Sequence, residues 1–171
     1  MSTGLPEIID PIALCKQGVE LTGEIPLNSM KRLESIVIDV VGEARVELYF
    51  SITDQAEKLI TGRVAAVVVA ECQCCLQPVQ LDINCDVNLQ LVVDEADIAE
   101  LCDEREPLLL QDESGVELLE IVEDELLLGL PIVALHDKSV CQISNTSSEP
   151  VDLPNKSNPF SSLSLLKQPK E

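Results

Sequence analysis

Apolar and polar residues alternate along the segment from Val79 to Val93. Successive side chains of an extended chain point to opposite faces, so a two-residue period of this length predicts a long, half-buried strand. Cys85 falls on the apolar face, where we expect a small buried side chain rather than a ligand. The apolar positions are Val79, Leu81, Ile83, Cys85, Val87, Leu89, Leu91 and Val93, and Gln80, Asp82, Asn84, Asp86, Asn88 and Gln90 lie between them.

Other segments upstream have the β-branched or alternating character of strands. Residues 59–70 are apolar at most positions, which indicates a strand with more burial on both faces. A helical turn is expected from Asn28 to Glu34, with Asn28 or Ser29 as its N-terminal cap. The predicted strands are 19–25, 36–41, 46–52 and 59–70, so the body should be predominantly antiparallel β.

The period changes further along the chain, where Leu118, Val122 and Leu126 recur at helical spacing and acidic residues take the other face. This pattern predicts an amphipathic acidic helix from Val116 to Leu130, and Pro131 should end it. The fold class is therefore α+β, a mostly antiparallel sheet or partly closed barrel with one amphipathic acidic helix and a flexible C-terminal tail.

Glu125 is the exception on this helix. At about 100° per residue it falls within the apolar arc and not among the other acids. We expect it to reach the edge of the core or to pair with a buried base, with Arg45 and Arg63 as the candidates, rather than to act in catalysis.

The chain should form one domain. Its 171 residues are 46% hydrophobic, enough for a single core. We expect this α+β domain to span residues 1–142, followed by a flexible linker over 143–157 that is rich in Ser, Asn and Pro. A short amphipathic segment over 158–171 begins with Asn158 and Pro159 and places Phe160, Leu163 and Leu166 on one face, which should dock on the domain or on a partner.

The net charge and the aromatic content limit the kinds of partner that the protein can bind. The formal net charge is −20, and aromatic residues make up only 2% of the chain, so phosphate-binding cations and base-stacking platforms are both scarce. Acids crowd the stretch from Asp94 to Glu125, where Arg105 is the one base. This stretch either meets a basic partner or forms a solvated face that keeps the protein soluble.

The start of the chain has neither a basic region nor an apolar stretch of the signal-peptide kind, and no stretch reaches the apolar length of a membrane span. We therefore expect a cytoplasmic protein with reduced or metal-bound cysteines. There is also no Gly-rich phosphate loop or nucleophile elbow, and the chain has a single His, so an enzyme is not expected.

Cys72 and Cys75 form a Cys-x-x-Cys pair, and His136 and Cys141 form a second ligand-type pair downstream. Together they would complete the Cys3His shell of a structural zinc site, if the fold brings the pairs together. Cys74 is a competing ligand, and reduced cysteines without metal remain the plainer interpretation. A thiol-disulfide enzyme is the weakest reading, because its pair should lie at a helix N-terminus and this one lies between strands.

Several segments, in order along nearly the whole chain, resemble the YceD family of large ribosomal RNA subunit accumulation proteins. The matching pieces are Asp10-Pro11, residues 71–78 (Glu-Cys-Gln-Cys-Cys-Leu-Gln-Pro), residues 122–133 (Val-Glu-Asp-Glu-Leu-Leu-Leu-Gly-Leu-Pro-Ile-Val), His136-Asp137 with Cys141, and Asn158-Pro159-Phe160 followed by Leu163 and Lys167. Two features depart from the family pattern. Cys74 stands where the family usually has Arg, and Gram-positive relatives carry more cysteines near the position of His136.

The resemblance implies a role in the accumulation or maturation of 23S ribosomal RNA, and the family's gene typically lies beside that for ribosomal protein L32. The expected partners are pre-ribosomal large-subunit components, 23S rRNA or a basic ribosomal protein such as L32, with no membrane and no small-molecule substrate. An acidic, non-catalytic domain could hold such a protein for nascent rRNA. The candidate partner-binding residues are Glu120, Glu123, Asp124, Glu125, Phe160 and Leu163.

Two alternatives remain open from the residues alone. One is direct rRNA binding through a local basic patch, which requires its cations to share one face. The other is a zinc- or thiol-dependent redox or metal-sensing protein built on the cysteines. The candidate RNA-binding residues are Lys31, Arg32, Arg45 and Arg63.

Overall fold

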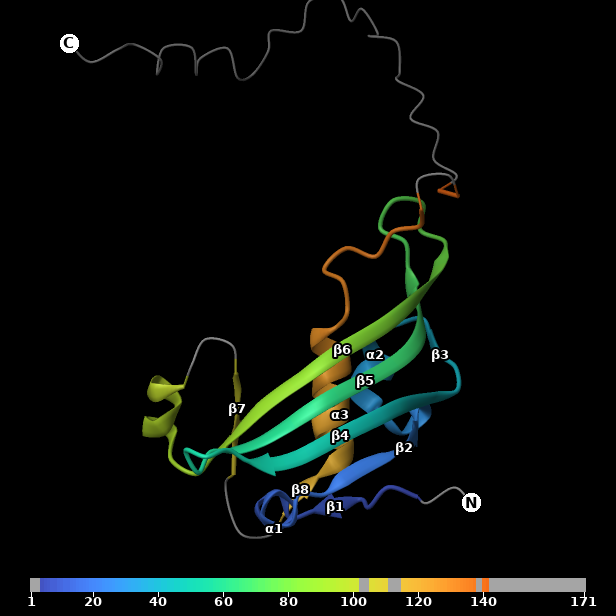
Figure 1. Ribbon diagram of the computed structural model, residues 1–171. Coiled ribbons are helices and arrows are strands. Elements are labelled where there is room, and N and C mark those ends of the chain that lie inside the picture. Colours follow the sequence, from blue (N-terminus) through green and yellow to red (C-terminus); the bar gives the residue numbers. More distant parts are fainter. Residues whose placement is uncertain (1–3, 102–104, 111–114, 138–139, 142–171) are drawn as a thin grey trace, which may run out of the picture.

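The computed structural model describes residues 4–101, 105–110, 115–137 and 140–141 (Figure 1). The expected linker and C-terminal amphipathic segment, with Phe160 and Leu163, lie outside this part. The elements in chain order are β1 (Ile8–Ile9), α1 (Pro11–Gln17), β2 (Glu20–Pro26), η1 (Leu27–Ser29), α2 (Lys31–Ile36), β3 (Asp39–Val40), β4 (Glu43–Ile52), β5 (Lys58–Glu71), β6 (Pro78–Val92), η2 (Glu95–Glu100), β7 (Glu106–Leu109), β8 (Val116–Glu117) and α3 (Leu118–Leu128).

One open sheet forms the body of the protein. Its order is β2-β4-β5-β6-β7, with β3 pairing the far end of β5, while β1 and β8 form a separate two-stranded ribbon. All pairs are antiparallel except β6 with β7, which are parallel. The α+β class and the antiparallel sheet are confirmed. The barrel alternative is wrong, because β2 and β7 lie at opposite edges of the sheet in the described residues.

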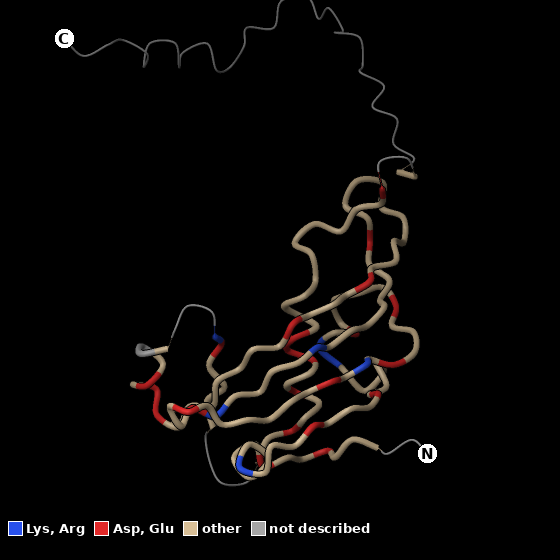
Figure 2. Tube along the Cα trace, in the orientation of Figure 1, with Lys and Arg blue, Asp and Glu red and all other residues tan. Residues whose placement is uncertain are grey.

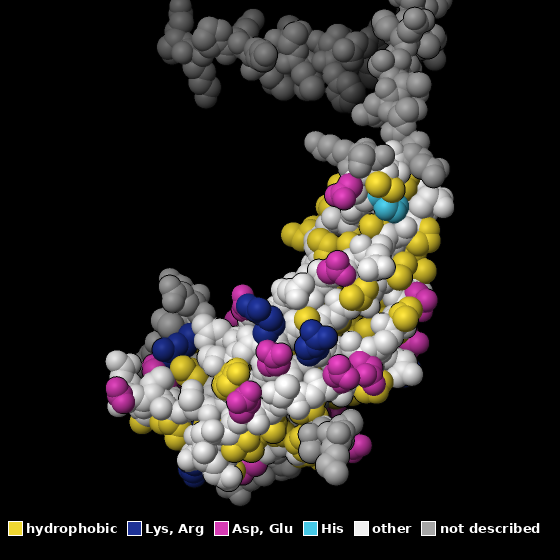
Figure 3. Space-filling model, turned by 45° about the vertical axis from the view of Figure 1, so that its right-hand side comes forward, with side chains coloured by type: hydrophobic (Ala, Val, Ile, Leu, Met, Phe, Trp, Pro, Cys, Tyr) yellow, Lys and Arg dark blue, Asp and Glu magenta, His cyan; other side chains and the backbone are white. Residues whose placement is uncertain are grey.

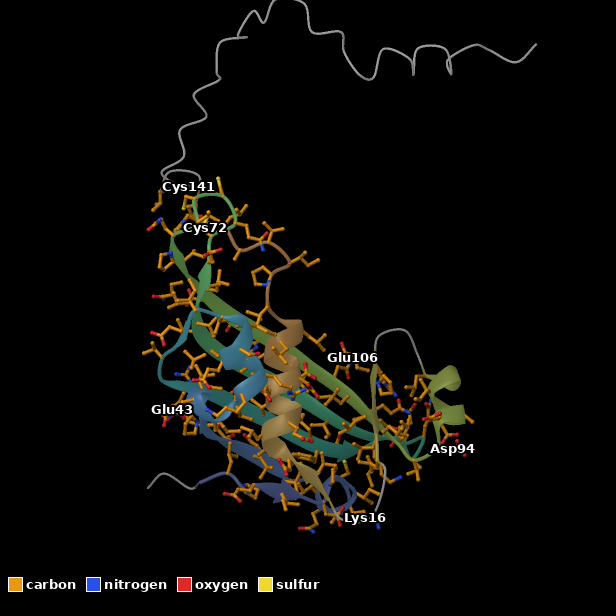
Figure 4. The ribbon with its side chains drawn as sticks, turned by 180° about the vertical axis from the view of Figure 1, so that it is seen from behind. Lys16, Glu43, Cys72, Asp94, Glu106 and Cys141 are labelled. Atoms are coloured by element: carbon orange, nitrogen blue, oxygen red, sulfur yellow. The ribbon has the colours of Figure 1, made fainter. Side chains whose placement is uncertain are left out.

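The alternation of β4, β5 and β6 sorts the sheet into two faces. In the register Val46 lies opposite Val64, and Val64 lies opposite Cys85, so the apolar positions of neighbouring strands share one face. Helices α2 and α3 cover that face (Figures 1 and 4). The buried side chains between sheet and helices include Leu33, Val46, Leu48, Phe50, Ile60, Val64, Leu118, Val122 and Leu126. The other face is exposed and largely polar on β4 and β6, whereas on β5 it also carries apolar side chains such as Ala65, Val67 and Val69.

The helices differ from the expectation at their ends. The acidic helix exists but starts at Leu118, because Val116 and Glu117 pair with β1 instead. The segment predicted as strand 36–41 contains only β3, since Ile36 still belongs to α2. The predicted caps Asn28 and Ser29 lie in the preceding turn, and no side chain at the α2 N-cap position forms a capping hydrogen bond.

Gly129 is placed where α3 ends against β6. A Cβ at this position would overlap Cys85 Sγ and lie 2.8 Å from Ile83 Cγ2. We therefore expect Gly129→Ala to lower the free energy of unfolding by about 1–3 kcal/mol, because a packed core cannot absorb an added methyl group without displacement. Urea denaturation measures the loss. Gly4→Ala is the matched control, since a Cβ there meets nothing within 4 Å, and equal stability losses in both variants would contradict the close approach.

The β5–β6 hairpin is the longest element of the fold and extends past the helices (Figure 1). The segment after α3 returns along it to the hairpin tip, where Cys72, Val79 and Ala134 form a small buried cluster separate from the main core. The pair Cys72 and Cys75 and the pair His136 and Cys141, which are far apart in the sequence, therefore meet at this tip.

Candidate metal centre and acidic surface

The hairpin tip is a tight turn that encloses Cys72. The Cys72 N–H donates to the Gln77 carbonyl at 2.9 Å, and the Leu76 N–H donates to the Cys72 carbonyl at 2.8 Å. Leu76 adopts φ of 59°, the left-handed conformation that lets the chain reverse. Cys72 is fully buried as a result.

The segment after α3 is fastened to this turn by hydrogen bonds. The Gln73 N–H donates to the Ala134 carbonyl at 2.9 Å. His136 Nε2 lies 2.9 Å from the Pro78 carbonyl, and because a carbonyl only accepts, Nε2 carries the proton. In the neutral imidazole Nδ1 is then the nitrogen with a free lone pair, and it lies 3.4 Å from Cys75 Sγ. The backbone of the β6 start thus orients the His136 ring with a metal-ligating nitrogen toward the cysteines.

The structure brings all four predicted ligand residues together. One ligand atom from each of Cys72, Cys75, His136 and Cys141 lies within 4.8 Å of each of the others, and Figure 4 shows Cys72 and Cys141 at the same end of the molecule. Cys74, the competing ligand, is exposed and does not belong to this group. We call these four residues the Cys3His cluster.

The electrostatics of the cluster favour at least one thiolate. The backbone N–H of Cys75 is the largest influence on Cys72 and, with the N–H groups of His136 and Cys74, outweighs burial and lowers the Cys72 pKa to about 6. At Cys75 the Gln77 N–H lowers the pKa, but burial and the neighbouring sulfurs raise it above the ordinary value overall. Three sulfur donors and one imidazole match the soft, tetrahedral preference of zinc, so the donor set fits that ion.

Glu123 turns out to be a structural residue. It is 5% exposed, and its Oε1 accepts the N–H groups of Arg32 at 2.7 Å and Leu33 at 3.0 Å, while Oε2 accepts Arg32 Nε at 2.9 Å. It therefore caps the N-terminus of α2 from a different helix. Burial raises its pKa, but these donors prevail and hold the pKa below the ordinary range. No local spacing signals this contact, because Arg32 and Glu123 are 91 residues apart.

Glu125 lies two residues further on and has the opposite environment. It is 7% exposed, and burial, aided by the charges of Glu106 and Asp124, raises its pKa to about 7. The expected pairing with Arg45 or Arg63 is wrong: Arg63 pairs with Asp86 at 2.9 Å on the exposed face of the sheet, and Arg45 is exposed on that same face. Within the described residues, the Glu125 carboxylate has no hydrogen bond or ion pair.

The predicted basic patch does not gather on one face. Lys31 and Arg32 belong to α2, which covers the inner face of the sheet, whereas Arg45 and Arg63 lie on the outer face. Lys31 pairs with Glu34, and Arg32 pairs with Glu123 and Asp124. Figure 2 shows acidic positions close to the cationic ones along the chain, and Figure 3 shows acidic side chains beside cationic ones on one face of the molecule. Of the other predicted partner-binding residues, Glu120 is exposed, and so is Asp124, although it pairs with Arg32.

The fold and the cluster together define an acidic α+β protein with a Cys3His cluster at the tip of its longest hairpin. A family model described as "Large ribosomal RNA subunit accumulation protein YceD" matches residues 60–167. A protein of that name from Haemophilus influenzae is 31% identical over 168 residues, which cover 96% of this chain and 97% of the relative. The chain therefore belongs to the YceD family.

No solved structure matches the chain significantly. Among the described residues, no helix has both the length and the apolar character needed to cross a membrane.

Proposed function

We propose that the protein is a non-enzymatic ribosome biogenesis factor that supports the accumulation of large-subunit 23S rRNA by holding a basic ribosomal protein, with L32 as the first candidate. The family description and the name of the Haemophilus influenzae relative support the link to large-subunit rRNA. Neither name specifies a partner, but the exposed acids of the protein favour a basic one.

The observation that carries the proposal is that several cations already have carboxylate partners, whereas many exposed acids have no cation beside them. Lys31, Arg32, Arg63 and Arg105 each pair with a carboxylate. Exposed acids without an ion pair in the described ranges surround β7 and α3, and they include Asp94, Glu95, Asp97, Glu106, Glu117 and Glu120. A surface of this kind repels phosphate and attracts a basic protein, which it can bind and release as ionic conditions change.

We also propose that the Cys3His cluster holds a structural zinc ion. Its donors are those of structural zinc sites, and the hydrogen bond from His136 Nε2 to the Pro78 carbonyl fixes the ring as second-shell contacts do in such sites. When bound, zinc would tie the hairpin tip to the segment that follows α3. A redox role is less well supported, since Cys72 is buried and the pair lies in a hairpin turn instead of at a helix N-terminus.

Affinity purification of the tagged full chain from growing cells tests the proposed function, with both RNA and protein identified. We expect a basic large-subunit ribosomal protein to be recovered at low salt, to be lost at moderate salt because the contact is ionic, and to survive nuclease treatment. Recovery of 23S rRNA alone, or loss of every ribosomal protein after nuclease, would instead favour direct RNA binding. Reversal of Arg45 and Arg63 to Glu then tests that alternative, because an unchanged gel shift with 23S fragments excludes these arginines.

A further inference from the structure

A cavity of about 360 Å³ lies between α3 and β7. Three carboxylates line it: Glu106 from β7, and Asp124 and Glu125 from α3. Figure 4 labels Glu106 on the side of the molecule where β7 passes α3. The cavity is thus an acidic site built by two elements that are separate in sequence.

Apolar side chains form the remaining walls of the cavity. Leu89 contributes from β6, Pro107 from β7 and Leu127 from α3. Such walls suit the aliphatic stem of a long side chain, whose charged end would then reach the carboxylates. The combination of apolar walls and acidic groups differs from a solvated acidic face, which has no enclosed volume.

Glu125 is the independent sign of a ligand. More than nine-tenths of its surface is buried and it lines the cavity, and among the described residues no hydrogen bond or ion pair holds its carboxylate, whose oxygens keep a small contact with the open cavity. The described groups that face it offer no positive charge. Cys85 Sγ on β6 donates to the Glu125 carbonyl and not to its carboxylate, Glu106 on β7 is itself acidic, and Asp124 is paired with Arg32.

The base that directly precedes β7, Arg105, also has partners of its own. Arg105 precedes Glu106 in the chain, but it pairs with Glu57 at 2.8 Å and donates to Gln90 at 2.8 Å. A buried carboxylate without a cation is costly, and a protein that retains one at a cavity is retaining it at the expense of its own stability. The raised pKa of Glu125 reflects the same lack of compensation.

We propose that this cavity receives a single lysine or arginine side chain from the basic protein partner, with its cationic end between Glu125 and Glu106. The proposal rests on the proposed function and adds the place of contact. The apolar walls would take the stem of the side chain, and the cation would supply the charge that Glu125 lacks. Such enclosed charge pairs, unlike exposed ones, determine which partner is held.

An octa-arginine peptide tests the cavity directly, with the uncharged octa-citrulline peptide as its control. Binding is measured by calorimetry at pH 8 with the full chain. We expect Glu125→Gln and Glu106→Gln each to weaken octa-arginine binding about 5-fold or more, as removal of one member of a close charge pair does. Asp82→Asn removes the same charge from an exposed position on the outer face of β6, opposite Val67, and it should change the affinity less than about 2-fold.

Equal weakening by all three variants, or binding of octa-citrulline as tight as that of octa-arginine, would overturn the proposal, because either result means that no charge pair forms at the cavity. The cell experiment separates this failure from that of the proposed function. If the unaltered chain and Glu125→Gln recover the same basic ribosomal protein equally well, the cavity is not the contact although the function stands. If the unaltered chain recovers no basic protein, the function fails whatever the peptide shows.

Discussion

Replacing Cys72 with serine should abolish zinc binding, whereas replacing Cys74 with serine should leave it intact. Cys72 supplies one sulfur of the Cys3His cluster and is buried inside the turn, while Cys74 is exposed and outside the cluster. A serine hydroxyl is a poor zinc ligand, so the metal content should fall from about one ion per chain to less than about a tenth. Elemental analysis of the purified variants measures it.

The loss of metal should loosen the hairpin tip and leave the main core folded. Cys72, Val79 and Ala134 form their own buried cluster, which is separate from the core beneath α3, with Leu81 packed against both. We therefore expect amide hydrogen exchange to accelerate over residues 72–79 and 131–137 in Cys72→Ser, with strand β4 still protected. Chelation of the unaltered protein should reproduce this pattern.

The same pair of variants separates the metal from the redox interpretation. If Cys72→Ser contains as much metal as Cys74→Ser and the unaltered protein, the cluster does not bind zinc in the proposed way. If the unaltered protein is isolated without zinc and its Cys72 and Cys75 cycle between thiol and disulfide, the redox alternative gains support. Thiol titration with and without chelator distinguishes these results, because zinc-bound sulfurs react only after the metal is removed.

The elements of the fold could be predicted where the chain repeats a pattern. The alternation from Val79 predicted β6, and the spacing of Leu118, Val122 and Leu126 predicted α3. Short elements were less predictable, because Ile36 is β-branched and yet closes a helix whose position tertiary contacts decide. The Cys3His cluster was foreseeable from residue types alone, but its convergence depends on the long hairpin and on the turn after α3.

The roles of the acids could not be predicted, because they depend on partners far away in the sequence. Periodicity placed Glu125 inside the apolar arc and grouped Glu123 with the exposed acids. In the structure both are buried, and within the part of the chain that the structure describes only Glu123 has a cation, supplied by α2 from 91 residues upstream. Helical spacing specifies which face a residue takes, but not what the opposing element offers it.

Glu123→Gln should destabilise the protein at neutral pH. The amide keeps the size of the side chain and one oxygen that can still accept the N–H groups of Arg32 and Leu33, but it loses the negative charge and the second oxygen, which accepts Arg32 Nε. Removing one member of a buried, hydrogen-bonded pair costs about 2–4 kcal/mol. Because donors hold the pKa of Glu123 below its ordinary value, the contribution is complete above that value and is lost as the pH falls through the folded-state pKa. The variant and the unaltered protein should therefore converge in acid.

Glu125→Gln should do the reverse, although it changes the same residue type two positions along the same helix. The folded-state pKa of Glu125 is about 7, above the ordinary 4.5, so the unaltered protein loses stability as the pH rises between these values and bears the full cost of the buried charge above them. The advantage of Glu125→Gln should grow from about 1 kcal/mol at pH 5.5 to about 3 kcal/mol at pH 8.5, before any constant cost of burying the amide. Urea denaturation of both proteins at each pH measures the difference in the free energy of unfolding. The other acids contribute equally to both proteins, so their pH dependence largely cancels in this difference. A difference that stays constant with pH would show that the Glu125 carboxylate is already compensated within the chain, and the cavity beside it would then have no unmet charge for a partner to satisfy.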